Sequence, residues 1–158
     1  MKFPAIFSII VIFGYVGYSS AMSMVEPISF VLQVTYNLPV LDWESKCSES
    51  YKDIVKLTRE TGNLTLFLLP GSISEKLPNS KSTEGLDDLI KKDCIGSQDL
   101  KNISQKVVSS VQKCLEEDKK LDTANEEEMK KALINSMCRS VQSSIEWNIQ
   151  SIKFTQNQ

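Results

Sequence analysis

Histidine is absent from this 158-residue chain. Histidine is the general base of Ser-His-Asp and Cys-His catalysis and one of the usual ligands of zinc. Its absence excludes these two catalytic arrangements and most zinc sites. No two cysteines have the Cys-x-x-Cys spacing of a thiolate metal site either. We therefore expect no catalytic residue, no metal site and no cofactor.

A basic surface is also missing. The formal net charge is −2, and both signs are interspersed along the chain. Nucleic-acid-binding domains carry clustered Lys and Arg, so we expect no nucleic-acid partner. Beyond the N-terminus no apolar run is long enough to cross a bilayer, so we expect no membrane insertion of the mature chain.

The N-terminus has the pattern of a secretory signal peptide. Met1 and Lys2 precede an apolar run over residues 3–18, and Ser19-Ser20-Ala21 places small residues where signal peptidase cuts. The alternative is a membrane anchor, but the run is shorter than the roughly 20 residues of a spanning helix and contains two glycines. We predict a signal peptide over residues 1–21 and a secreted, extracellular product, a single helical domain over residues 22–158.

Apolar spacing predicts helices along most of this domain. One face recurs from Trp43 every three or four residues, with Asp42 placed to cap it and Gly62 to end it. Its members are Trp43, Cys47, Tyr51, Ile54 and Val55. Residues 28–38 and 64–69 leave helix and strand both open. Helix is preferred for the first segment, and the second is expected to be either a buried helical turn or a short strand.

Residues 70–85 are rich in Pro, Gly and Ser and predict a loop. A short helix is expected to end at Gly96, and Ser97 to cap the next, over residues 97–117. Asn125 is expected to cap a helix reaching Ile152, with Glu128 completing a capping box. Its apolar stripe is Met129, Ala132, Leu133, Met137, Val141, Ile145 and Ile149. The predicted fold is an all-α, disulfide-stapled bundle of four to five helices.

Four cysteines, Cys47, Cys94, Cys114 and Cys138, are expected to form disulfides in an oxidising compartment. Suppose the helices over residues 97–117 and 125–152 form an antiparallel hairpin. Cys94 and Cys114 then lie about 30 Å apart, and Cys114 and Cys138 are offset by roughly 18 Å. Bonded cysteines need Cα atoms within about 7 Å. Elimination predicts Cys94–Cys138 and Cys47–Cys114.

Asn63-Leu64-Thr65 and Asn102-Ile103-Ser104 match the N-glycosylation sequon. In a secreted chain we expect glycans on Asn63 and Asn102. The carboxylates at 116–118 and 126–128 could be calcium ligands, but they lack the alternating oxygen ligands of a calcium loop. We expect them to lie at solvated helix ends. Met129, Met137 and Trp147 either line a cavity for an apolar ligand or belong to the core, and the core is preferred.

The order KKDC (91–94), VQKCL (111–115) and SMC (136–138) resembles the insect 27 kDa haemolymph glycoprotein family. The resemblance implies a secreted helical protein and no catalytic residues. We predict a non-enzymatic binding protein of haemolymph, saliva or venom type that acts on an extracellular protein or receptor. The alternative is a carrier that encloses a small apolar ligand between helices, and no ligand-binding residue can be named for it.

Overall fold

A computed structural model describes residue 28 and residues 31–38, 43–79 and 81–156. These residues form six α-helices and no strand, and two disulfides link the helices, which confirms the all-α, disulfide-stapled prediction. The predicted signal peptide over residues 1–21 and the predicted cap Asp42 lie outside the described residues.

The predicted Trp43 helix is two helices. α3 (Trp43–Lys46) and α4 (Ser48–Asn63) meet at Cys47, whose φ of −148° and ψ of 54° break the helix. Ile54 and Leu57 face the core, whereas Val55 is 41 % exposed and does not belong to the buried stripe. The extra break is one reason why the structure has more helices than the four to five predicted.

Gly62 does not end α4, contrary to the prediction. The helix continues through the π-turn η3 (Leu64–Leu68) into α5 (Leu69–Ser74). Thr61 and Thr65 are fully buried, and their hydroxyls donate to the carbonyls of Leu57 and Thr61. The wide turn precedes Pro70, whose ring would clash with a carbonyl of a regular α-helix. Residues 64–69 are thus helical, and the predicted loop begins only after Ser74.

The next helices follow the prediction closely. α6 (Leu86–Leu89) continues as the π-helix η4 (Ile90–Ile95), and the chain turns at Gly96. α7 (Gln98–Cys114) starts where Ser97 accepts a hydrogen bond from the Leu100 amide at 3.4 Å, as a capping serine should.

The cap of the last helix is Asp122, so the prediction of Asn125 with a capping box to Glu128 is wrong. The Asp122 carboxylate accepts from the Asn125 amide at 2.8 Å, and α8 runs over Thr123–Gln156. Sequence spacing allowed either cap, because both Asp and Asn are good capping residues. The helix also passes Ile152, its predicted end.

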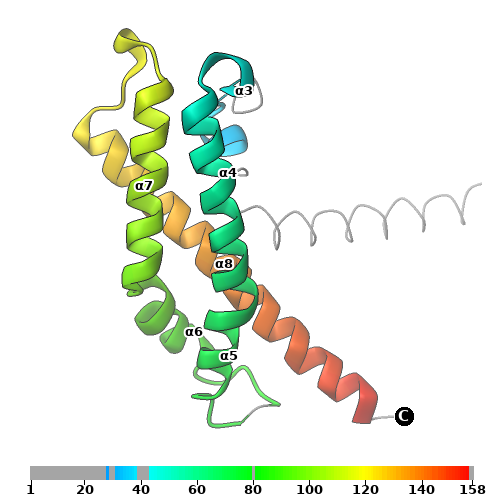
Figure 1. Cartoon of the computed structure of the whole chain (residues 1–158). Coiled ribbons are helices and arrows are strands. Elements are labelled where there is room, and N and C mark those ends of the chain that lie inside the picture. Colours follow the sequence, from blue (N-terminus) through cyan, green and yellow to red (C-terminus); the bar gives the residue numbers. More distant parts are fainter. Residues whose placement is uncertain (1–27, 29–30, 39–42, 80, 157–158) are drawn as a thin grey trace, which may run out of the picture.

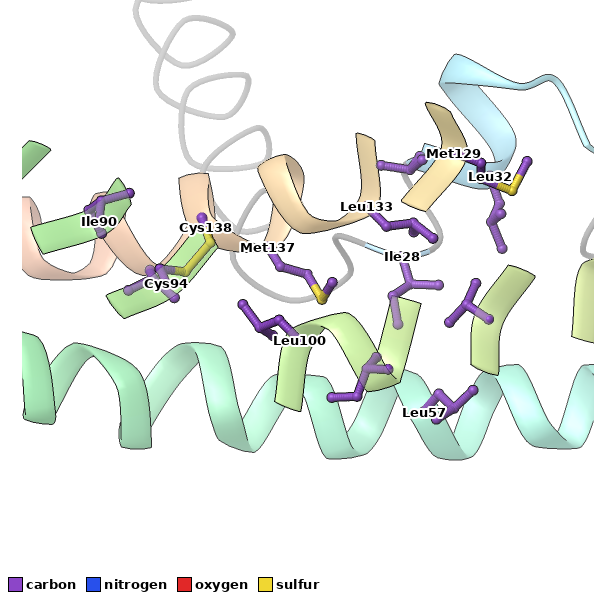
Figure 2. Close-up of a cluster of buried hydrophobic side chains, with 14 of the residues drawn as sticks. Ile28, Leu32, Leu57, Ile90, Cys94, Leu100, Met129, Leu133, Met137 and Cys138 are labelled. Carbon is purple, nitrogen blue, oxygen red and sulfur yellow. A yellow bond between two sulfur atoms is a disulfide. The ribbon is translucent and has the colours of Figure 1, made fainter. Parts of the chain in front are cut away.

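Figure 1 shows α4 and α7 side by side, with α8 crossing them and its C-terminal end extending beyond them. The apolar stripe of α8 from Met129 to Ile145 faces the others and forms the centre of the core (Figure 2). Within the segment 28–38, open between helix and strand in the sequence, Val31–Thr35 form the π-helix η1, which packs on α8. Ile28, Val31 and Leu32 are buried there.

Candidate interaction surface

Both disulfides join the predicted partners. Cys47 is bonded to Cys114 and Cys94 to Cys138, with a Cα–Cα distance of 5.7 Å in each pair. The first bond ties the start of α4 to the end of α7, and the second ties η4 to the middle of α8 (Figure 2). All four thiols are used, so these cysteines hold the bundle together and offer no nucleophile.

The two predicted glycosylation sites lie on neighbouring helices, α4 and α7. Asn63 is exposed at the end of α4, and Asn102 is exposed in the first half of α7. The hydroxyl residue of each sequon, Thr65 or Ser104, is buried and donates to a backbone carbonyl. The asparagines therefore face solvent, although their sequons are part of packed helices.

Seven large apolar side chains are exposed among the described residues. Five of them lie on two segments, η3 and the end of α8. The first segment carries Phe67 (71 %) and Leu68 (65 %), which we call the Phe67 patch. The second carries Trp147 (64 %), Ile152 (38 %) and Phe154 (68 %), which belong to residues 147–156, the α8 tip. Trp147 and Phe154 are seven residues apart, two helical turns, and so share a face.

Both segments are almost free of charge. Residues 61–74 contain no Asp, Glu, Lys or Arg, and the α8 tip contains only Lys153. Charged residues make up 24 % of the whole chain. Large exposed apolar patches that lack charge mark interaction sites on soluble proteins. The two segments therefore stand out from the rest of the described surface.

A groove runs between α5 and the end of α8, and we call it the end groove. Its volume is about 470 Å³, and it is open to solvent. Apolar side chains and small uncharged residues line it: Pro70, Gly71, Ser74, Leu77, Ile145, Asn148, Ile149, Ser151 and Ile152. Four residues of the α8 tip line the groove: Asn148, Ile149, Ser151 and Ile152. Ser151 is four residues from Trp147 and three from Phe154, so the two aromatic side chains lie beside the groove edge.

A second hollow, the Tyr36 cavity, opens at the other end of the bundle. It has a volume of about 380 Å³ and is lined by Tyr36, Asn37, Leu38, Trp43, Lys46, Cys114, Leu115, Glu116, Lys119, Leu121 and Met129. Burial and, to a lesser degree, the nearby Glu128 carboxylate raise the pKa of Tyr36. A hydrogen bond from Lys119 to Glu116, 2.7 Å long, lowers the pKa of Glu116 at the rim.

Met129, Met137 and Trp147, which were expected either to line a cavity or to form the core, lie in three different environments. Met137 is fully buried in the core and Met129 lies at the boundary between the core and the Tyr36 cavity, whereas Trp147 is mostly exposed. The described residues contain no group of His, Cys, Asp or Glu arranged to hold a metal ion. No helix in the described ranges is long and apolar enough to cross a membrane.

Sequence reasoning missed the Phe67 patch and Phe154. The run LTLFLLP at 64–70 is uniformly apolar, which predicts burial but does not show which side faces solvent. The missed signal was the charge-free stretch 61–74 within a charged chain. No protein-family model, curated protein or solved structure matches this chain.

Proposed function

We propose that this chain is a secreted, non-enzymatic binding protein of an extracellular fluid, which acts by docking a partner protein or receptor on the α8 tip and the end groove. The observation that carries the proposal is the exposure of Trp147, Ile152 and Phe154 on a nearly uncharged helix end beside an apolar groove.

The energetics of this surface suit a protein partner. Burying one large apolar side chain that was exposed is worth about 1.5–3 kcal/mol, and Trp is enriched among the residues that dominate interfaces. Apolar grooves of this kind can accept the apolar face of a partner helix. The lining of the end groove carries no charge, so the fitting segment is apolar and uncharged at the contact.

The proposed location rests on the N-terminal sequence and the disulfides. Residues 1–21 have the signal-peptide pattern, and both disulfides belong to an oxidising compartment. The resemblance of residues 91–138 to the 27 kDa haemolymph glycoproteins supports the same location. The absence of histidine, the commonest general base, supports a role other than catalysis.

A carrier of a small apolar ligand is the second candidate, and the Tyr36 cavity favours it. Ligand pockets range from about 300 to 1,000 Å³, and this cavity of about 380 Å³ lies near the lower limit. Leu38, Trp43 and Leu115 would contact the apolar part of a ligand, and the Tyr36 hydroxyl would orient its polar end. The charged rim and the opening to solvent make the cavity less suited to enclosing a ligand than a closed pocket would be.

Retention of a partner by matched variants tests the proposal. The mature chain is immobilised and exposed to the extracellular fluid of the organism that produces it, and retained proteins are quantified by mass spectrometry. We expect one protein to be retained by the unaltered chain and by Val55→Ser, which changes an exposed apolar residue elsewhere. The double variant Trp147→Ser/Phe154→Ser should lose it.

Three other results would count against the proposal. Equal retention by the double variant would show that the α8 tip is not the docking surface. A retained small molecule in native mass spectra, lost on Trp43→Ala, would favour the carrier. A dimer of the unaltered chain in sedimentation, lost on Phe154→Ser, would show that the tip binds a second copy.

A further inference from the structure

The Phe67 patch lies one helical turn from a glycosylation acceptor. Asn63 and Phe67 are four residues apart in the continuous helix formed by α4 and η3, and this spacing places two side chains on the same face. Both are exposed, and no charged residue occurs between positions 61 and 74. A group attached to the Asn63 amide would therefore lie on the same side of the helix as the Phe67 ring, within one turn of it.

The chemistry of an N-linked glycan fits this neighbour. The first sugar, N-acetylglucosamine, has one face made mainly of C–H groups, and such a face packs on an aromatic ring whose face is electron-rich. The contact removes apolar surface of Phe67 from water, which is favourable. A sugar at this position gives the patch a cover without any partner protein.

We propose that Asn63 carries an N-linked glycan whose first sugar packs on Phe67 and covers the Phe67 patch. The inference rests on the proposed passage of the chain through the secretory pathway. It divides the exposed apolar residues into two groups. The chain's own glycan covers Phe67 and Leu68, and the α8 tip stays available for a partner.

The burial of Thr65 indicates that the glycan is added before this helix folds. The transferase must reach the hydroxyl of the sequon, but in the folded chain Thr65 is fully buried and donates to the Thr61 carbonyl at 2.8 Å. The transfer therefore precedes the folding of this helix. In that step the Asn63 amide nitrogen bonds to the anomeric carbon of a lipid-linked oligosaccharide, the lipid diphosphate leaves, and the amide loses one proton.

Asn102 provides a control within the same chain. It is also exposed, and its sequon hydroxyl on Ser104 is also buried. The residue four positions later is Lys106, and Gln98, four positions earlier, donates a hydrogen bond to Asn102 at 3.0 Å. A glycan on Asn102 thus meets polar neighbours, and its loss should expose no apolar surface.

The test uses the full chain expressed in a eukaryotic secretory host. Peptide mapping first shows whether Asn63 is modified. Binding of the dye ANS, which fluoresces on apolar surfaces, and the melting temperature are then compared for the unaltered chain, Asn63→Gln and Asn102→Gln. We expect Asn63→Gln to increase ANS fluorescence and to lower Tm by about 2–4 °C. Asn102→Gln should change neither.

Two further samples assign the effect to Phe67 and to the first sugar. In a Phe67→Ser background, Asn63→Gln should no longer increase ANS fluorescence. Trimming the unaltered protein with an endoglycosidase that leaves one N-acetylglucosamine should keep the fluorescence low. An unmodified Asn63, equal effects of the two asparagine variants, or an effect of Asn63→Gln that persists without Phe67 would each overturn the proposal.

The docking proposal is tested separately. If the chain stays inside the cell with both asparagines unmodified, the glycan proposal and the proposed secretion fail together. Retention of a partner by oxidatively refolded, unglycosylated protein still decides whether the α8 tip is a docking surface. Failure of one proposal can therefore be told apart from failure of the other.

Discussion

The two parts of α8 have similar apolar residues and opposite surroundings. From Met129 to Ile145 the helix presents a stripe to the rest of the bundle, where α8 packs mainly on α7, η4 and η3. Its members Met129, Leu133, Met137, Val141 and Ile145 are fully buried. From Trp147 onward only Ile149 is buried, beside α5, whereas Trp147, Ile152 and Phe154 are exposed and the end of the helix extends beyond α4 and α7 (Figure 1). Composition alone therefore does not make a core. The second part of the helix thus keeps large apolar residues that the fold leaves exposed.

The Cys94–Cys138 bond anchors only the buried part, and removing it should give the largest effect. The double variant Cys94→Ala/Cys138→Ala opens a loop whose ends are 44 residues apart. The chain-entropy model gives a loss of about 4 kcal/mol in the free energy of unfolding. Chemical denaturation measures it. A loss below about 1 kcal/mol would show that packing alone holds α8 in place.

Truncating Met137 tests the buried stripe itself. Met137 is fully buried at the centre of the core, and Met137→Ala removes contacts and leaves a cavity. We expect the free energy of unfolding to fall by about 2–5 kcal/mol. The control is Lys131→Ala on the exposed side of the same helix, which should change it by less than about 0.5 kcal/mol. Equal effects of the two variants would contradict the assignment of the core.

Gln112 links α7 to the start of α8 and should have a smaller effect. Its amide nitrogen donates to the Leu121 carbonyl at 2.7 Å and to Glu126 at 2.6 Å, and its oxygen accepts from the Leu121 amide at 3.0 Å. Gln112→Ala should cost about 1–2 kcal/mol of unfolding free energy. The control in the same denaturation experiment is Gln105→Ala, at an exposed position on α7. If Gln112→Ala lowers the free energy of unfolding no more than this control does, the link does not stabilise the fold.

Phe154→Ala should have the smallest effect on stability. Phe154 is 68 % exposed, so its truncation should change the free energy of unfolding by less than about 0.5 kcal/mol. Its effect on partner retention should nevertheless be large, because an aromatic side chain at an interface loses its whole contact area. A stability loss comparable to that of Met137→Ala would mean that the α8 tip is buried in solution.

The sequence predicted most of the elements that have a strong period. The stripe of α8, the cap at Ser97 and the two cysteine pairs followed from helical spacing and from distances along helices. The stretch from Gly62 to Ser74 was not predictable in the same way. Glycine is compatible with both a helix end and a helix interior, and the outcome depended on packing against α8 and on the π-turn before Pro70.

The candidate site was harder to predict than the fold. Trp147 was grouped with Met129 and Met137, because all three are apolar and share one helix. Met137 belongs to the buried stripe, whereas Trp147 lies between the buried Ile145 and Ile149 on the other side of the helix. The helical period places Trp147 off the stripe, but it does not show whether another element covers that side. The low charge of residues 61–74 and 147–156 is visible in the sequence. It indicates an interaction surface only where these residues are exposed, and exposure is known only from the structure.

Site-specific photo-crosslinking compares the α8 tip with the buried part of the same helix as a contact surface for a partner. A photoreactive amino acid replaces Phe154 in one sample and Lys131, an exposed residue on the buried part of the same helix, in another. Both proteins are irradiated in the extracellular fluid of the source organism, and crosslinked species are identified by mass. We predict one defined protein adduct from position 154 and none from position 131. Adducts of equal yield from both positions, or none from position 154, would contradict the claim that the α8 tip is the docking surface.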